Sequence, residues 1–75
     1  MKKYTVYSQI ERYYNSIGWQ GANRKQYDSF EEAIKKIETL DAEDIEIRKE
    51  YPNHDMRIRK VVENATKKVV FTTER

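Results

Sequence analysis

Aromatic and basic side chains are the residues of this chain best suited to specific contacts with another molecule. Six tyrosines and one tryptophan occur among the 75 residues. Tyrosine, tryptophan and arginine are enriched at protein interfaces, and aromatic rings also stack on the bases of single-stranded nucleic acids. The alternating pattern described below brings several of these side chains to one solvent-facing sheet surface. The residues expected to bind a partner are Tyr7, Tyr13, Trp19, Arg48, Arg57 and Arg59.

Two kinds of partner fit such a surface. A protein would use the tyrosines and arginines as interface anchors, whereas a single-stranded nucleic acid would use them for stacking and phosphate contacts. The net charge of only +2, and the position of Glu46 and Glu50 among the arginines, favour the protein. A third alternative is that the tyrosines only form strands, for which tyrosine has a high propensity. We therefore expect a non-enzymatic protein-binding module, with single-stranded nucleic-acid binding as the alternative.

Residues for catalysis, cofactor binding or metal binding are sparse. The chain has no cysteine, and its one histidine, His54, falls in a turn that follows Pro52. A single histidine cannot build a multi-histidine metal site, and general-base catalysis needs a nucleophile and a pocket beside it. The segment Gly18-Trp19-Gln20-Gly21 matches the G-x-x-G loop of KH domains, but a predicted strand precedes it and neither middle residue is basic. We expect no enzymatic activity, no cofactor and no metal.

Apolar runs in the sequence are short. The longest run of aliphatic and phenylalanine residues is Val69-Val70-Phe71, too short to cross a membrane, and the first residues lack the apolar stretch of a signal peptide. We expect a cytoplasmic protein without a membrane partner. A core of this size supplies about 3–5 kcal/mol of net stability, so a homodimer is a further alternative.

Hydrophobic periodicity predicts which elements must position these side chains. Apolar residues recur every three or four positions from Phe30 to Leu40, which predicts a helix that ends near Leu40, and Ser29 with Glu32 forms a capping box at its start. Alternation of apolar and polar residues predicts strands instead. The predicted strands cover residues 3–13, 24–27, 45–51, 56–62 and 68–73, and residues 15–23 form a loop.

Matching the apolar faces of these strands gives a register. Tyr51 is expected opposite Met56, which places Arg48 opposite Arg59, and Glu63 is expected opposite Lys68. The predicted fold is a single α+β domain over residues 1–75, a two-layer sandwich of one helix on a four- to five-stranded, mostly antiparallel sheet. The element order is ββαβββ, or βαβββ without the strand at 24–27. Trp19 is either part of a thin core or a displayed anchor.

The chain also resembles a known class of proteins in its layout. The run from Tyr27 to Ile34 and the run from Met56 to Val62 resemble the strand, S-F-x-E-A helix and R-I-x-K-V-V hairpin of small phage and prophage accessory proteins from low-GC bacteria. Many such proteins, anti-CRISPR and other anti-defence proteins among them, are single-domain binders that inhibit or redirect a host enzyme. The resemblance implies an inhibitor of a host defence protein and assigns no role to any residue.

Overall fold

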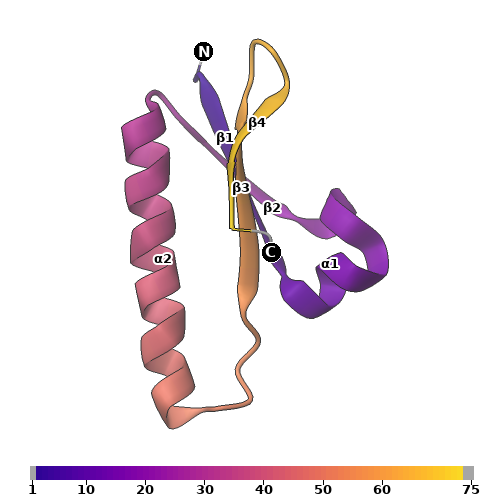
Figure 1. The fold of residues 1–75 in the computed structure, drawn as a ribbon, viewed down its shortest axis with the longest axis vertical. Helices are drawn as coiled ribbons and strands as arrows, with labels where there is room; N and C mark the ends of the chain where they lie inside the picture. The colour runs from indigo at the N-terminus through magenta and orange to yellow at the C-terminus, as the bar shows by residue number, and fades with distance from the viewer. Residues whose placement is uncertain (1, 74–75) are drawn as a thin grey trace.

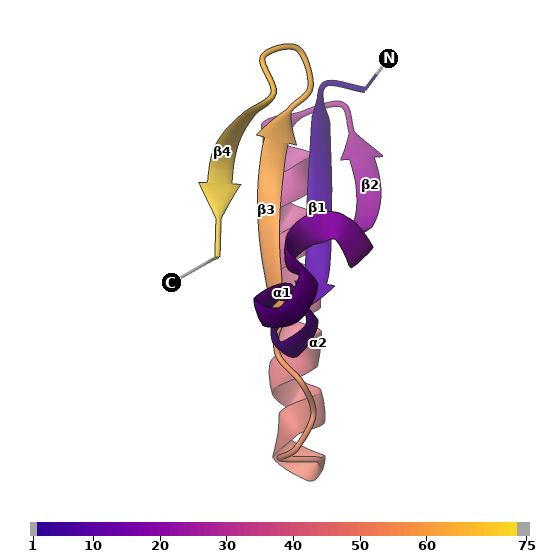
Figure 2. The same ribbon diagram turned by 90° about the vertical axis from the view of Figure 1, so that its right-hand side faces the viewer.

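The chain forms one helical layer against a four-stranded sheet. The computed structural model describes residues 2–73. The strands are antiparallel, the long helix covers one face of the sheet, and a short helix lies against the other face (Figures 1 and 2). The predicted α+β two-layer sandwich is confirmed, with four strands in the spatial order β2-β1-β3-β4. In chain order the elements are β1 (Tyr4–Ile10), α1 (Glu11–Ile17), the 3-10 helix η1 (Gly18–Gly21), β2 (Asn23–Tyr27), α2 (Phe30–Glu50), β3 (Arg57–Glu63) and β4 (Lys68–Thr72).

Strand β1 begins where the alternation predicts it but ends earlier. Its last residue, Ile10, pairs with Arg57, the first residue of β3. Because β3 begins at Arg57, a strand continued through residue 13 would have no neighbouring strand to pair with. The chain instead enters α1 at Glu11, whose backbone N–H donates to the Met56 carbonyl at 3.0 Å. Helix α1 ends at Gly18, whose φ of +67° lies in the left-handed region that glycine adopts freely. The prediction of a loop over residues 15–23 is therefore wrong, because most of them are helical.

Helix α2 begins at the predicted cap and extends further than expected. The Ser29 hydroxyl accepts a hydrogen bond from the Glu32 backbone N–H at 3.2 Å, which confirms the start of the helix. The helix continues to Glu50 and, in Figure 1, extends beyond the end of the strands. The strand predicted over residues 45–51 is wrong, and so is its pairing with Met56.

The sheet-facing side of this extension is polar, which is why periodicity did not detect it. Asp41 and Asp44 follow Ile37 at spacings of four and seven residues, so all three lie on one side of α2. Both carboxylates bind the guanidinium of Arg59 in β3. Ion pairs thus take the place of apolar contacts between this half of α2 and the sheet.

The hairpin of β3 and β4 follows the prediction closely. Glu63 pairs with Lys68 and Val62 with Val69, as the sequence indicates. The register then shifts between Val61 and Val62, so that Val61 pairs with Phe71. With a strand at 23–27 and none at 45–51, the strands and the long helix follow the order ββαββ, which is neither of the two predicted orders.

The main core lies between α2 and the middle of the sheet. Its buried members are Val6, Ala33, Ile37 and Val61, with Tyr4, Tyr27, Ile34 and Phe71 packed around them. Val61 pairs with Val6, so the odd-numbered residues of β3 face α2. The prediction that Arg57 and Arg59 lie on the solvent-facing surface of the sheet is therefore wrong. The alternation favours the opposite face, because the even-numbered positions of β3 carry Ile58 and Val62 whereas Val61 is the one apolar residue at the odd-numbered positions.

Candidate functional site

The six residues predicted to bind a partner do not form one surface. Tyr7 and Trp19 lie together, with ring centroids 6.5 Å apart. Arg48 lies in the last turn of α2, away from the sheet face it was expected to share. Tyr13 lies on α1 with 48% of its surface exposed. The two remaining arginines face α2, so the predicted Tyr/Arg surface does not exist as a unit.

Arg59 is buried, and each nitrogen of its guanidinium donates an intramolecular hydrogen bond. Its side chain is 2% exposed, and it donates to Asp44 at 3.1 Å, to Asp41 and to the Ser8 hydroxyl at 3.2 Å. A buried guanidinium needs such partners, since burial of an unpaired charge is strongly unfavourable. Arg59 therefore holds the helix to the sheet and is not available to a partner.

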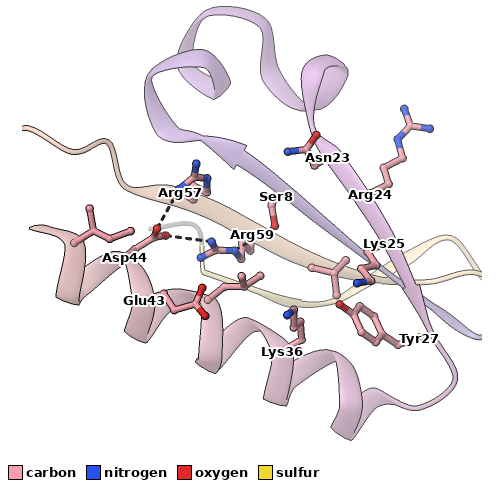
Figure 3. A pocket seen from close by; sticks show the side chains of 13 residues that line it. Ser8, Asn23, Arg24, Lys25, Tyr27, Lys36, Glu43, Asp44, Arg57 and Arg59 are labelled. Atoms are coloured by element: carbon pink, nitrogen blue, oxygen red, sulfur yellow. Dashed lines mark hydrogen bonds and ion pairs between the residues drawn. The ribbon is translucent and has the colours of Figure 1, made fainter.

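Asp44 is the centre of this ion network. Its carboxylate accepts from Arg57 at 3.0 Å as well as from Arg59 (Figure 3). The carboxylate also lies 3.3 Å from Nε2 of His54. His54, expected in a turn that follows Pro52, is half-buried beside this carboxylate. Two guanidinium donors and one imidazole thus converge on one buried carboxylate.

The second face of the sheet carries a cluster of aromatic and basic side chains. Tyr7 pairs with Arg24 of β2 on one side and with Lys60 of β3 on the other, which forms a row across three strands. The Lys60 ammonium lies 5.0 Å from the centroid of Tyr7 and 4.8 Å from that of Trp19, and the Arg24 guanidinium lies 5.5 Å from that of Tyr7. We call Tyr7, Trp19, Arg24 and Lys60 the aromatic face.

Trp19 is neither a core residue nor a freely displayed anchor. It is half-buried, and its ring lies 4.9 Å from Tyr14 of α1 and 6.5 Å from Tyr7. The η1 turn approaches the sheet closely here, because a Cβ on Gly21 would lie 3.0 Å from Nε2 of Gln9. The G-x-x-G segment thus places Trp19 in a half-buried aromatic cluster with Tyr7 and Tyr14.

A groove separates the C-terminal half of α2 from strand β2. Its volume is about 480 Å³, and Figure 3 shows side chains of β1, β2, β3 and α2 around it. Val6, Leu40 and Ile47 give it apolar walls. We call this space the α2–β2 groove and define it by Val6, Lys25, Tyr27, Lys36, Leu40 and Ile47.

Two lysines of the α2–β2 groove have no acidic partner. Lys25 of β2 and Lys36 of α2 point into the space between helix and sheet (Figure 3), and neither forms an ion pair or a side-chain hydrogen bond with residues 2–73. Arg57 and Arg59 also line the groove, but the Asp44 network occupies them. Glu43 lines the groove further along α2, two turns after Lys36. Neither lysine was among the residues predicted to bind a partner. Two features of the sequence indicate their position: Lys25 lies two residues before Tyr27, on the same face of the strand, and Lys36 is adjacent to the core residue Ile37.

The edge of the sheet beside this groove is free. Within residues 2–73, strand β2 pairs only with β1, and it is the first strand in the order β2-β1-β3-β4. Its residues are exposed except Tyr27, which is half-buried. The backbone groups on its outer side are therefore open to another chain.

Comparison of the chain with protein-family models, with curated proteins and with solved structures found no match. No helix within residues 2–73 combines the length and the apolar character needed to cross a membrane.

Proposed function

We propose that this protein is a non-enzymatic module that binds a protein partner in the α2–β2 groove. The observation that carries the proposal is the pair of unpartnered lysines, Lys25 and Lys36, which flank apolar walls beside a free strand edge. Apolar walls supply binding energy and the flanking charges supply orientation, which is the usual anatomy of a docking site.

The layout similarity to phage and prophage accessory proteins motivates a narrower form of this proposal. In that form the partner is a cytoplasmic defence protein of a bacterial host, and binding inhibits it. This narrower form rests on the layout of the runs Tyr27–Ile34 and Met56–Val62.

Site-specific photo-crosslinking tests the proposed docking site. A photoreactive amino acid placed at Lys36 is expected to capture a protein from a lysate of the producing cells, whereas the same group at Lys35 is not. Lys35 is the adjacent residue of α2 and is exposed outside the groove. The captured protein is then purified and titrated against the wild type and a Lys25→Glu, Lys36→Glu variant. Equal affinity for both would exclude the groove as the docking site.

Single-stranded nucleic-acid binding by the aromatic face is a second candidate. Glu46 and Glu50, which were expected to cancel the charge of an open Tyr/Arg face, lie on α2 instead. The row Arg24, Tyr7 and Lys60 contains two cations and no carboxylate.

A salt titration with labelled single-stranded DNA and RNA tests this candidate. Binding by the aromatic face should weaken steeply as salt rises, and Tyr7→Ala should cost about 1–3 kcal/mol of binding free energy through lost stacking. Lys60→Gln should lower the salt slope by about one, with Lys35→Gln as the control. Affinity that is unchanged in Tyr7→Ala would exclude the aromatic face.

A further inference from the structure

We infer that the α2–β2 groove receives an acidic, extended segment of the protein partner, which adds to the edge of β2 as a fifth strand. This inference rests on the proposed function and names the chemistry of the partner at that site. It follows from the free backbone edge, the unpaired cations and the sequence of β2.

The geometry of β2 limits the length of the added segment. The strand has five residues, Asn23–Tyr27, so it offers about 17 Å of backbone edge. It contains no proline, and its neighbour in the sheet lies only on the inner side. Main-chain hydrogen bonds to such an edge give affinity, while the alternating side chains of the added strand give specificity.

The alternation of β2 predicts which side chains the added segment needs. Lys25 and Tyr27 pair with Val6 and Tyr4, so they face α2, whereas Arg24 pairs with Tyr7 and faces the other side. A residue paired with Lys25 would enter the groove near Lys36, where an acidic side chain is favoured. Its neighbour, paired with Arg24, would be acidic as well, and the residue paired with Tyr27 would be apolar. The expected motif is therefore two adjacent acidic residues with an apolar residue on the Tyr27 side.

The same charges disfavour a second copy of this chain at the β2 edge. Lys25 is the central residue of the five, so symmetric antiparallel pairing of two β2 strands would place one Lys25 opposite the other. Like charges directly opposite each other destabilise a sheet. Arg24 lies beside Lys25, and β2 contains no acidic residue that would compensate.

Binding of short labelled peptides tests the inference on the whole protein. The probe is a peptide of about seven residues in which Asp and Glu stand side by side between valines and threonines. The matched peptides carry two lysines in place of the acidic pair, or a central proline that prevents strand pairing. Fluorescence anisotropy at low ionic strength gives the affinity. Backbone amide exchange, measured by NMR, locates the bound peptide.

The acidic peptide is expected to bind and to slow amide exchange within residues 23–27, and the lysine and proline peptides are expected to bind at least about tenfold more weakly. The double variant Lys25→Glu, Lys36→Glu should lose about tenfold in affinity for the acidic peptide. The control is Lys35→Glu, Lys67→Glu, which changes the net charge equally at exposed residues that do not line the groove. Thermal melts of both variants establish that they fold.

The inference is wrong if the acidic peptide does not bind, if the lysine peptide binds equally well, or if the bound peptide protects amides outside β2. It is also wrong if the free protein sediments as a dimer and its β2 amides are already protected from exchange. Failure here is separable from failure of the proposed function. If crosslinking at Lys36 captures a partner through a basic or helical segment, only this inference is wrong. If no adduct forms at that position, the groove is not a docking site at all.

Discussion

The guanidinium of Arg59 and the carboxylate of Asp44 form an ion pair between β3 and α2 that is shielded from solvent on both sides. Their closest atoms lie 3.1 Å apart, and the two side chains are 2% and 5% exposed. The pair joins residues fifteen positions apart in the sequence. It fixes the C-terminal half of α2 against the sheet, where few apolar contacts exist.

Removal of one member of this pair should therefore destabilise the fold strongly. Arg59→Met leaves Asp44 buried with only Arg57 and His54 as partners, and we expect a loss of about 3 kcal/mol in the free energy of unfolding. Denaturant titration followed by circular dichroism measures it. Arg48→Met, at an exposed position in the last turn of α2, should cost less than about 1 kcal/mol.

A double variant shows whether the two residues act together. Arg59→Met with Asp44→Leu should be more stable than the sum of the two single changes predicts, because neither charge is then left unpaired. Simple additivity would contradict the coupling.

Ile37 and Leu40 should differ in their contribution to stability although both lie on the sheet side of α2. Ile37 is 2% exposed within the core, so Ile37→Ala should cost about 2–5 kcal/mol. Leu40 is half-buried and lines the groove, and Leu40→Ala should cost about 1 kcal/mol. Equal losses in thermal or chemical unfolding would mean that the groove is closed in solution.

Ala42→Pro distinguishes a continuous helix from a helix that ends near Leu40. Because residue 42 lies inside α2, proline there removes a backbone hydrogen bond and should cost about 3 kcal/mol or more. Ala42→Gly at the same position should cost about 1 kcal/mol. A proline variant as stable as the glycine variant would fit a turn at this position instead.

Trp19→Ala should lower stability moderately, because the ring packs against Tyr7 and Tyr14 while part of it remains exposed. We expect a loss of about 2 kcal/mol in the free energy of unfolding. The tryptophan emission of the wild type should be only partly accessible to a neutral quencher. Emission as accessible as that of the unfolded chain would show that Trp19 does not pack against Tyr7 and Tyr14.

Tyr27 makes stability depend on alkaline pH. Burial against the core raises the pKa of its hydroxyl above the ordinary value of 10.0. The folded state thus holds this proton more tightly, so the contribution to stability is present below pH 10 and is lost as the pH rises through the folded-state pKa. The free energy of unfolding should fall less steeply above pH 10 in Tyr27→Phe than in the wild type. Identical slopes would show that the hydroxyl is solvated.

Local signals in the sequence determined the start of α2 and the β3–β4 hairpin. The bond from Glu32 to Ser29 spans three residues, and the pairs Glu63 with Lys68 and Val62 with Val69 close across a short turn. Such contacts depend on neighbouring residues, so patterns of residue types predict them. For the candidate site, the same reasoning identified Tyr7 and Trp19 but not their cationic neighbours.

Only the tertiary structure decided which way β3 faces, how far α2 extends and where the groove lies. In isolation, Ile45 and Ile47 alternate with charged residues as in a strand, and Asp44 interrupts the helical stripe. In the fold, Asp44 meets Arg59, and their ion pair favours a helix over these residues and turns both arginines of β3 away from the open face. Asp44 and Arg59 are distant in the sequence, and the energy of their ion pair depends on how deeply both are buried. A local sequence pattern contains neither piece of information.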